Sequence, residues 1–369
     1  MTAPQLEIQL IGVVAAAACA LPGVFLVLRS MAMVSDAITH TVLLGIILGF
    51  FVVADLTSPL LLVGAAAVGL ATVSLIELVR RTGLVREDAA IGLVFPLLFS
   101  VAVILIARFA DQVHLDTDAV VLGELAFAPF DRVVVGGWDL GPKALFVMGS
   151  ILLVNAAVIA VFYKELKLAT FDPALALALG FSPAIVQYLL MALVSVTAVG
   201  AFDAVGSILV VALMVAPPAT AYLLTDRLST MLALSAAIGV AGALAGYWVA
   251  HALDASIAGS MATMLGALFA VALLLAPDRG LVSLARRRAR QRWEFAQVML
   301  AIHLFTHERT PEAAEEARVE HLAEHLRWEP EFAARVVRQA ERRGVVARQD
   351  GSLEITEPGR RLAREAIVA

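Results

Sequence analysis

The chain has 369 residues, of which 61% are hydrophobic and 16% charged, and its mean hydropathy is +0.89. Soluble domains are about half apolar and about a quarter charged, so this composition excludes an ordinary soluble protein and predicts a membrane protein. The formal net charge is −5, and the single cysteine, Cys19, excludes both an intramolecular disulfide framework and a metal site built from several thiolates.

Eight apolar runs are long enough to cross a membrane, since a spanning helix needs about 20 apolar residues. They are Ile8–Leu28, Ala37–Ala54, Leu56–Ile76, Ala89–Ala107, Ala144–Tyr163, Ser182–Thr225, Leu228–Ala250 and Ala255–Ala276. The run Ser182–Thr225 is long enough for two helices and carries one charge, Asp203. The sequence therefore predicts an all-α membrane protein with eight or nine transmembrane helices.

Lysine and arginine gather in every second loop between these runs, which is typical of cytoplasmic loops. Examples of these basic residues are Arg80, Arg81, Lys164 and Lys167. The intervening loops are acidic, and the one that carries Asp116, Asp118 and Glu124 is expected to be a solvated outer loop. The alternative is that it concentrates cations or contacts a partner protein. Nine spans would leave the N-terminus outside and the C-terminus inside. We therefore expect a multi-pass protein of the cell membrane with a cytoplasmic C-terminal part.

The C-terminal quarter has a different composition, because 30 of the 59 charged residues follow Leu284. Three helical patterns come first, then a hairpin signal with Asp350-Gly351 at its turn, then a last helix after Pro358. The helical patterns are Trp293–His307, Glu312–Arg327 and Glu331–Arg343. This order predicts a small winged-helix domain. We divide the chain into a transmembrane domain, residues 1–284, and a cytoplasmic winged-helix-like domain, residues 285–369.

Asp36 and His40 are the sharpest candidate site residues. At spacing i, i+4 they share one face of a helix. A carboxylate with an imidazole suits Mn²⁺, Fe²⁺ or Zn²⁺, and ionisable groups at membrane depth are usually functional. The alternative is a structural Asp–His hydrogen bond that orients two helices. Asp203 either lines the same pathway at a helix break beside Gly200 and Gly206 or is a turn residue at the outer interface.

A short helix is predicted in the loop after Lys167. Asp172 suits its N-cap, Pro173 its first position, Ala174 its first turn and Gly180 its end. Such a helix outside the membrane is what a transport protein needs to bind a partner, and an ordinary interfacial helix is the alternative. The chain contains no G-x-x-x-x-G-K-[S/T] loop, so the energy for active transport would come from another chain or from an ion gradient.

Four stretches resemble the membrane permeases of ABC importers for zinc, manganese and iron. They are Leu26–Gly45, Arg86–Gly92, Leu115–Glu124 and Phe202–Ala221, and the similarity covers about Leu6–Pro277. The resemblance implies a permease subunit that is not itself an enzyme, paired with a second permease copy or a paralogue. It also implies a separate cytoplasmic ATPase and an extracytoplasmic metal-binding protein. Asp36 and His40 match the family's channel-lining metal residues, and Asp172–Gly180 is similar to importer coupling helices.

The C-terminal domain resembles the winged helix of iron-dependent repressors. It has 16 arginines against 14 acidic residues after Leu284, which is not the basic excess expected of a DNA-binding domain, so no nucleic-acid partner is expected. Two histidine pairs at i, i+4, His303 with His307 and His321 with His325, could bind metal, but exposed helix histidines are the commoner explanation. We expect a regulatory or assembly module.

The sequence therefore predicts the permease of an ATP-driven importer of divalent transition metals, manganese first, with zinc or iron as alternatives. The transported ion is its cargo, and no permanently bound cofactor is expected. Two rival functions are a secondary metal transporter driven by an ion gradient and a membrane-tethered, metal-responsive regulator.

Overall fold

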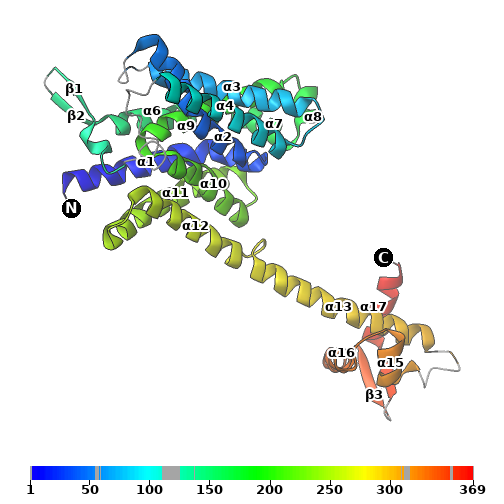
Figure 1. The fold of residues 1–369 in the computed structure, drawn as a ribbon. Helices are drawn as coiled ribbons and strands as arrows, with labels where there is room; N and C mark the ends of the chain where they lie inside the picture. The colour runs from blue at the N-terminus through cyan, green and yellow to red at the C-terminus, as the bar shows by residue number, and fades with distance from the viewer. Residues whose placement is uncertain are drawn as a thin grey trace. The chain divides into compact units, whose positions relative to one another are not determined.

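The computed structural model describes residues 2–54, 58, 60–109, 125–136, 138–308, 310, 316–349 and 352–368. The chain divides into two compact units, Met1–Gly280 and Leu281–Ala369. Figure 1 shows the helices of the first unit and the helices and hairpin of the second. The predicted domain boundary after residue 284 falls in the first turn of the helix that begins at Leu281 and stays a prediction.

The first unit is a helical bundle. Within the described residues, nine helices are long and apolar enough to cross a membrane. They are α1 (Ala3–Leu28), α2 (Ala32–Val53), α3 (Leu60–Arg81), α4 (Glu87–Phe109), α6 (Lys143–Val161), α9 (Pro183–Val205), α10 (Ser207–Leu224), α11 (Leu228–Leu253) and α12 (Ile257–Leu275). The sequence predicted eight or nine spans, and the described residues contain nine such helices.

Helix α1 forms the centre of the bundle and packs against α6, α9, α10 and α11 (Figure 1). Its small residues Ala15, Ala16, Ala18, Cys19 and Ala20 are fully buried and let these neighbours approach closely. One buried polar side chain links three of the helices: the Asn155 amide nitrogen donates to the Ala18 carbonyl at 3.0 Å and to the Thr197 hydroxyl at 2.8 Å. This bridge satisfies a polar group that would be costly to leave unpaired in the membrane.

Helices α2 and α3 pack at very short range. A Cβ atom added to Gly45 would meet the Cα of Ala65 at 2.4 Å and the Gly64 carbonyl oxygen at 2.6 Å. The absence of a side chain at Gly45 therefore permits this backbone approach. The Thr72 hydroxyl donates to the Thr41 hydroxyl at 2.9 Å across the same interface, and both residues are fully buried. The helix that carries Asp36 and His40 is thereby fixed against α3.

The long apolar run after Ser182 is confirmed as two helices. The break lies at Gly206, whose φ of +81° and ψ of 163° suit glycine alone, and α10 begins at the next residue. Gly200 lies inside α9 and does not break it.

An unexpected hairpin follows η1 (Ala128–Phe130). Strand β1 (Arg132–Val135) pairs antiparallel with β2 (Trp138–Pro142). The Arg132 guanidinium bonds Asp139 at 2.6 Å within the hairpin and Glu7 of α1 at 3.0 Å. These ion pairs connect the hairpin to the start of α1.

The second unit contains α13 (Leu281–His307), α15 (Val319–His325), α16 (Pro330–Arg342), β3 (Val346–Gln349), β4 (Ser352–Ile355) and α17 (Glu357–Val368). Strands β3 and β4 pair antiparallel as the predicted hairpin. The second unit has an apolar core of its own, in which Leu300, Leu322, Val336 and Ala363 are fully buried. Helix α13 starts before the predicted Trp293 because the intervening arginine-rich segment consists of good helix formers.

Candidate functional site

Asp36 and His40 lie one turn apart in the first half of α2. The His40 Nε2 is 3.5 Å from the Asp36 Oδ1, so the predicted shared face is observed. Both side chains are about one-third exposed, at 35% for Asp36 and 32% for His40, although flanking residues Ala37, Ile38 and Thr39 are buried. The pair therefore presents a carboxylate and an imidazole from a buried helix toward accessible space.

Two phenylalanines of α4 stand beside the imidazole. The His40 ring centroid is 5.2 Å from that of Phe95 and 6.0 Å from that of Phe99. These rings orient the imidazole and offer no competing oxygen or nitrogen ligand. The only strong donors presented by this group of four side chains are the nitrogen of His40 and the carboxylate of Asp36, which together suit a divalent transition metal.

A polar junction holds the connection between α1 and α2. The Arg29 Nε donates to the Thr170 hydroxyl at 3.2 Å, and its Nη1 donates to the Gln187 side-chain oxygen. Gln187 in turn donates to the Met31 sulfur at 3.2 Å. Burial lowers the pKa of the Arg29 guanidinium from its ordinary value. The junction joins the start of α2, the helix of Asp36 and His40, to α7 (Tyr163–Phe171) and α9. The sequence did not single it out.

Asp203 is not part of the pair. It lies in the last turn of α9, is exposed, and has Lys143 and Asp131 as charged neighbours. Within the described residues no hydrogen bond or ion pair joins it to Asp36 or His40. The acidic residues Asp116, Asp118 and Glu124 lie outside the described residues.

The predicted helix after Lys167 is α8 (Pro173–Ala178). The Asp172 carboxylate accepts from the Leu175 backbone nitrogen at 2.9 Å, and Pro173 occupies the first position. At the other end Gly180 has a φ of +87°, its N–H donates to the Leu177 carbonyl, and the Phe181 N–H donates to the Ala176 carbonyl. This is a Schellman cap, which requires a left-handed residue such as glycine.

Most of the side chains of α8 are exposed although they are apolar. Leu175 is 45%, Leu177 68% and Leu179 60% exposed, and Ala176 is buried. Ala174, in the first turn, is also exposed. A short helix with caps at both ends and an apolar outer face is suited to packing against another protein.

The two histidine pairs of the second unit come together. His303 and His307 of α13 face His321 and His325 of α15 around Glu316, a residue that the sequence pattern did not single out. Burial raises the pKa of the Glu316 carboxyl, but the surrounding imidazoles, His321 first, outweigh burial and leave this pKa below its ordinary value. Burial also lowers the pKa of His303. The site therefore favours a carboxylate and a neutral imidazole.

The nine apolar helices among the described residues define a multi-pass membrane protein, and Asp36 and His40 form a partly exposed polar pair on one of these helices. A profile of the ABC 3 transport family matches residues 6–276, and the chain belongs to this family.

Two relatives and one solved structure extend this comparison. The chain is 49% identical over 362 residues to the zinc transport system membrane protein TroD of Treponema pallidum, covering 98% of each chain. It is 48% identical over 272 residues to the manganese transport system membrane protein MntD of Bacillus subtilis, covering 74% of this chain and 92% of that relative. The structure of PsaBC from Streptococcus pneumoniae in complex with Fab is similar with a TM-score of 0.64 and 25% identity, over 77% of this chain and 96% of that one.

Proposed function

We propose that this chain is the membrane permease subunit of an ATP-driven importer of divalent transition metal ions. The observation that carries the proposal is the Asp36–His40 pair, half-buried on one face of a spanning helix, in a chain of the ABC 3 transport family. Manganese is the first cargo proposed, with zinc or iron as alternatives. The relatives named for zinc and for manganese support both of the first two metals.

The pair would hold the ion transiently during transport. One carboxylate oxygen and one imidazole nitrogen supply two ligands, which is a weaker set than the four of a structural zinc site. A transported ion must leave as well as enter, so an incomplete ligand set suits a carrier. Asp203, in the last turn of α9, is proposed as a secondary contact for the ion.

Helix α8 is the proposed docking element for a separate ATPase. Asp172 and Gly180 fix its two ends, Pro173 and Ala174 form its first turn, and its leucines are exposed. The Arg29 junction gives a physical path from this helix to the metal pair, because Thr170 lies three residues before α8 begins and Arg29 three residues before α2 begins. The chain contains no nucleotide-binding loop of the G-x-x-x-x-G-K-[S/T] form, so ATP hydrolysis belongs to the partner.

The remaining parts of the proposal concern orientation and partners. The basic loops support a cytoplasmic location for α8 and the C-terminal unit, and we propose a winged-helix fold for that unit because three helices precede its hairpin and one follows it. An extracytoplasmic metal-binding protein would deliver the ion. A second permease copy or a paralogue would complete the pathway.

Reconstitution tests this function against an ion-gradient transporter. The permease is placed in proteoliposomes with and without its ATPase subunit, and accumulation of radioactive manganese or zinc from the binding protein is measured with ATP on the ATPase side. We expect uphill accumulation only when the ATPase and ATP are both present. Uphill accumulation by the permease alone, driven by a proton or sodium gradient, would overturn the proposal.

A further inference from the structure

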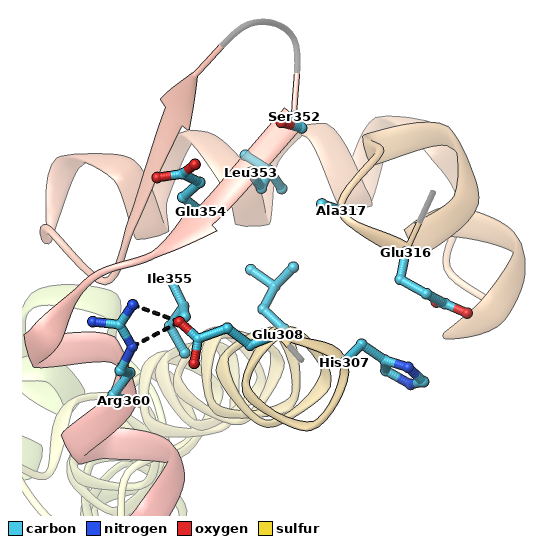
Figure 2. Close-up of a pocket in the computed structure, with 10 residues that line it drawn as sticks. His307, Glu308, Glu316, Ala317, Ser352, Leu353, Glu354, Ile355 and Arg360 are labelled. Atoms are coloured by element: carbon cyan, nitrogen blue, oxygen red, sulfur yellow. Dashed lines mark hydrogen bonds and ion pairs between the residues drawn. The ribbon is translucent and has the colours of Figure 1, made fainter. Parts of the chain in front are cut away.

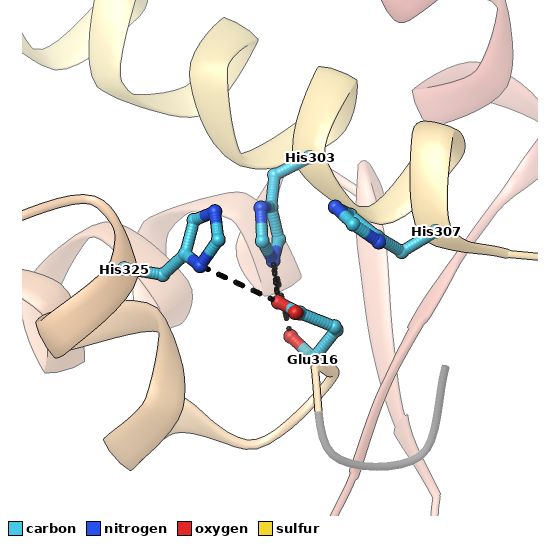
Figure 3. Close-up of side chains that lie close together, drawn as sticks. All are labelled: His303, His307, Glu316 and His325. Atoms are coloured by element: carbon cyan, nitrogen blue, oxygen red, sulfur yellow. Dashed lines mark hydrogen bonds and ion pairs between the residues drawn. The ribbon is translucent and has the colours of Figure 1, made fainter. Parts of the chain in front are cut away.

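Four histidines and one glutamate meet inside the C-terminal unit. His303 and His307 come from α13, His325 comes from α15, and Glu316 lies between the two helices in the chain (Figure 3). One ligand atom from each of these four residues lies within 4.8 Å of every other. In Figure 3 the Glu316 carboxylate points toward the imidazoles of His303 and His325, with His307 beside them.

Glu316 is the centre of the group. Its Oε2 lies 3.1 Å from the His303 Nε2, 3.1 Å from the His321 Nε2 and 4.0 Å from the His325 Nδ1. The side chains of Glu316 and His303 are only 11% and 5% exposed. A carboxylate surrounded by nitrogens at these distances is the arrangement found around a divalent metal ion.

One buried atom of the group, His307 Nδ1, has no hydrogen-bond partner among the described residues. Buried polar atoms are normally paired. This imidazole lies beside the ligand atoms of His303, Glu316 and His325, all within 4.8 Å of one another. A metal cation would accept lone pairs from all four of these side chains together.

We propose that His303, His307, Glu316 and His325 bind a divalent transition metal ion, at a site separate from the transport pair Asp36 and His40. Three imidazoles and one carboxylate suit Zn²⁺, Mn²⁺, Fe²⁺ or Co²⁺ and do not suit Mg²⁺ or Ca²⁺, which prefer oxygen ligands. His321 lies beside Glu316 and acts as a positioning residue for its carboxylate. The i, i+4 spacing of His303 and His307 presents two nitrogens from one face of α13.

A pocket in the same unit reaches this cluster. It has a volume of about 380 Å³, lies between α13 and β4, and counts His307 and Glu316 among its lining residues (Figure 2). The Arg360 guanidinium bonds Glu308 at 2.8 Å at another part of the pocket wall. The pocket gives a hydrated ion a route to the cluster, which a new metal site requires.

Direct metal binding tests the proposal on the full-length permease in nanodiscs. The chain carries Asp36→Asn and His40→Ala, so that failure of the transport site and failure of this site are distinguishable. Apo protein is titrated with Co²⁺ while visible absorption is recorded, and Zn²⁺ stoichiometry is measured by equilibrium dialysis. We expect one ion per chain, a visible band from nitrogen and oxygen ligands, and a rise in the thermal unfolding midpoint with Zn²⁺.

Variants of the cluster identify the ligands. His325→Ala changes a side chain that is 49% exposed and is expected to leave the fold intact, and Glu316→Gln keeps the size of the central residue. Each should weaken binding by more than about tenfold and abolish the Zn²⁺-dependent rise in the midpoint. His251→Ala, an exposed histidine on α11, is the matched control and should bind as the parent does. The proposal is overturned if the parent binds no ion, or if folded His325→Ala and Glu316→Gln proteins bind as tightly as the control.

Discussion

The Arg29 guanidinium donates to the Thr170 hydroxyl at 3.2 Å, although the two residues are 141 positions apart in the chain. Arg29 is the C-cap of α1 and lies three residues before α2 begins, and Thr170 lies in α7, three residues before α8 begins. This bond therefore links the connection that leads into α2, the helix of Asp36 and His40, to the segment that leads into α8, the proposed docking element.

Replacing Arg29 should uncouple these elements. Arg29→Met keeps the aliphatic length but removes the donors to Thr170 and Gln187. We expect the protein to insert and bind its ATPase while ATP-driven metal uptake falls severalfold, measured together with ATPase activity in proteoliposomes. Arg227→Met, at the exposed start of α11, is the matched control. Unchanged uptake by Arg29→Met at normal folded protein levels would show that the junction does not transmit motion.

The close approach of α2 and α3 should not tolerate a methyl group. Gly45→Ala would place a Cβ within 2.4 Å of Ala65, so the helices must separate. We expect a loss of stability of about 1–3 kcal/mol, in the range of an overpacked core. The measurement is the thermal midpoint of the detergent-solubilised protein. Gly92→Ala in α4, where no atom lies within 4 Å of the added Cβ, should unfold at the parent temperature or above it.

The cap of α8 gives a prediction about ATPase docking. Gly180→Val puts a β-branched residue at a φ of +87°, where it is strained, but meets no neighbouring atom within 4 Å. We expect normal insertion, a reduced amount of ATPase copurifying with the permease and a large loss of uptake. Gly266→Val, also in open space but without a positive φ, serves as the control. Full ATPase binding by Gly180→Val would argue for an ordinary interfacial helix.

The C-terminal unit should be dispensable for the membrane fold. The main core cluster runs from Ile8 to Leu265, and the second unit has its own cluster from Ala296 to Ala363. Truncation after Arg292 should therefore leave a monodisperse, inserted protein by size-exclusion chromatography, with altered transport or assembly. Sequence-specific DNA binding by this unit at nanomolar affinity would favour the tethered-regulator function.

Much of this architecture follows from apolar run length and glycine placement. The run after Ser182 divides where Gly206 takes a positive φ, and the caps at Asp172 and Gly180 match their sequence signals. The β1–β2 hairpin was missed although Gly136-Gly137 between β-prone residues is a turn signal, because the acidic composition of the region favoured a loop.

The cluster of His303, His307, Glu316 and His325 shows what sequence spacing alone does not reach. Both histidine pairs were visible at i, i+4, and each pair by itself is compatible with a solvated helix face. Packing of α15 near α13 brings the pairs together, and Glu316, which belongs to neither histidine pair, lies between them. Contacts of this kind depend on tertiary packing, which the local period of a helix does not encode.

Specific metal uptake by variants of Asp36 and His40 tests the central claim most directly. Uptake is measured per correctly folded permease, in cells that lack other importers, for Asp36→Asn, His40→Ala and the double variant. Since the two side chains act on one step, each single variant should lower uptake about tenfold or more, and the double variant should cost little more than either alone. Near-normal specific uptake by both single variants, accompanied only by a stability loss on the order of 1 kcal/mol, would contradict the account and reduce the pair to a structural hydrogen bond.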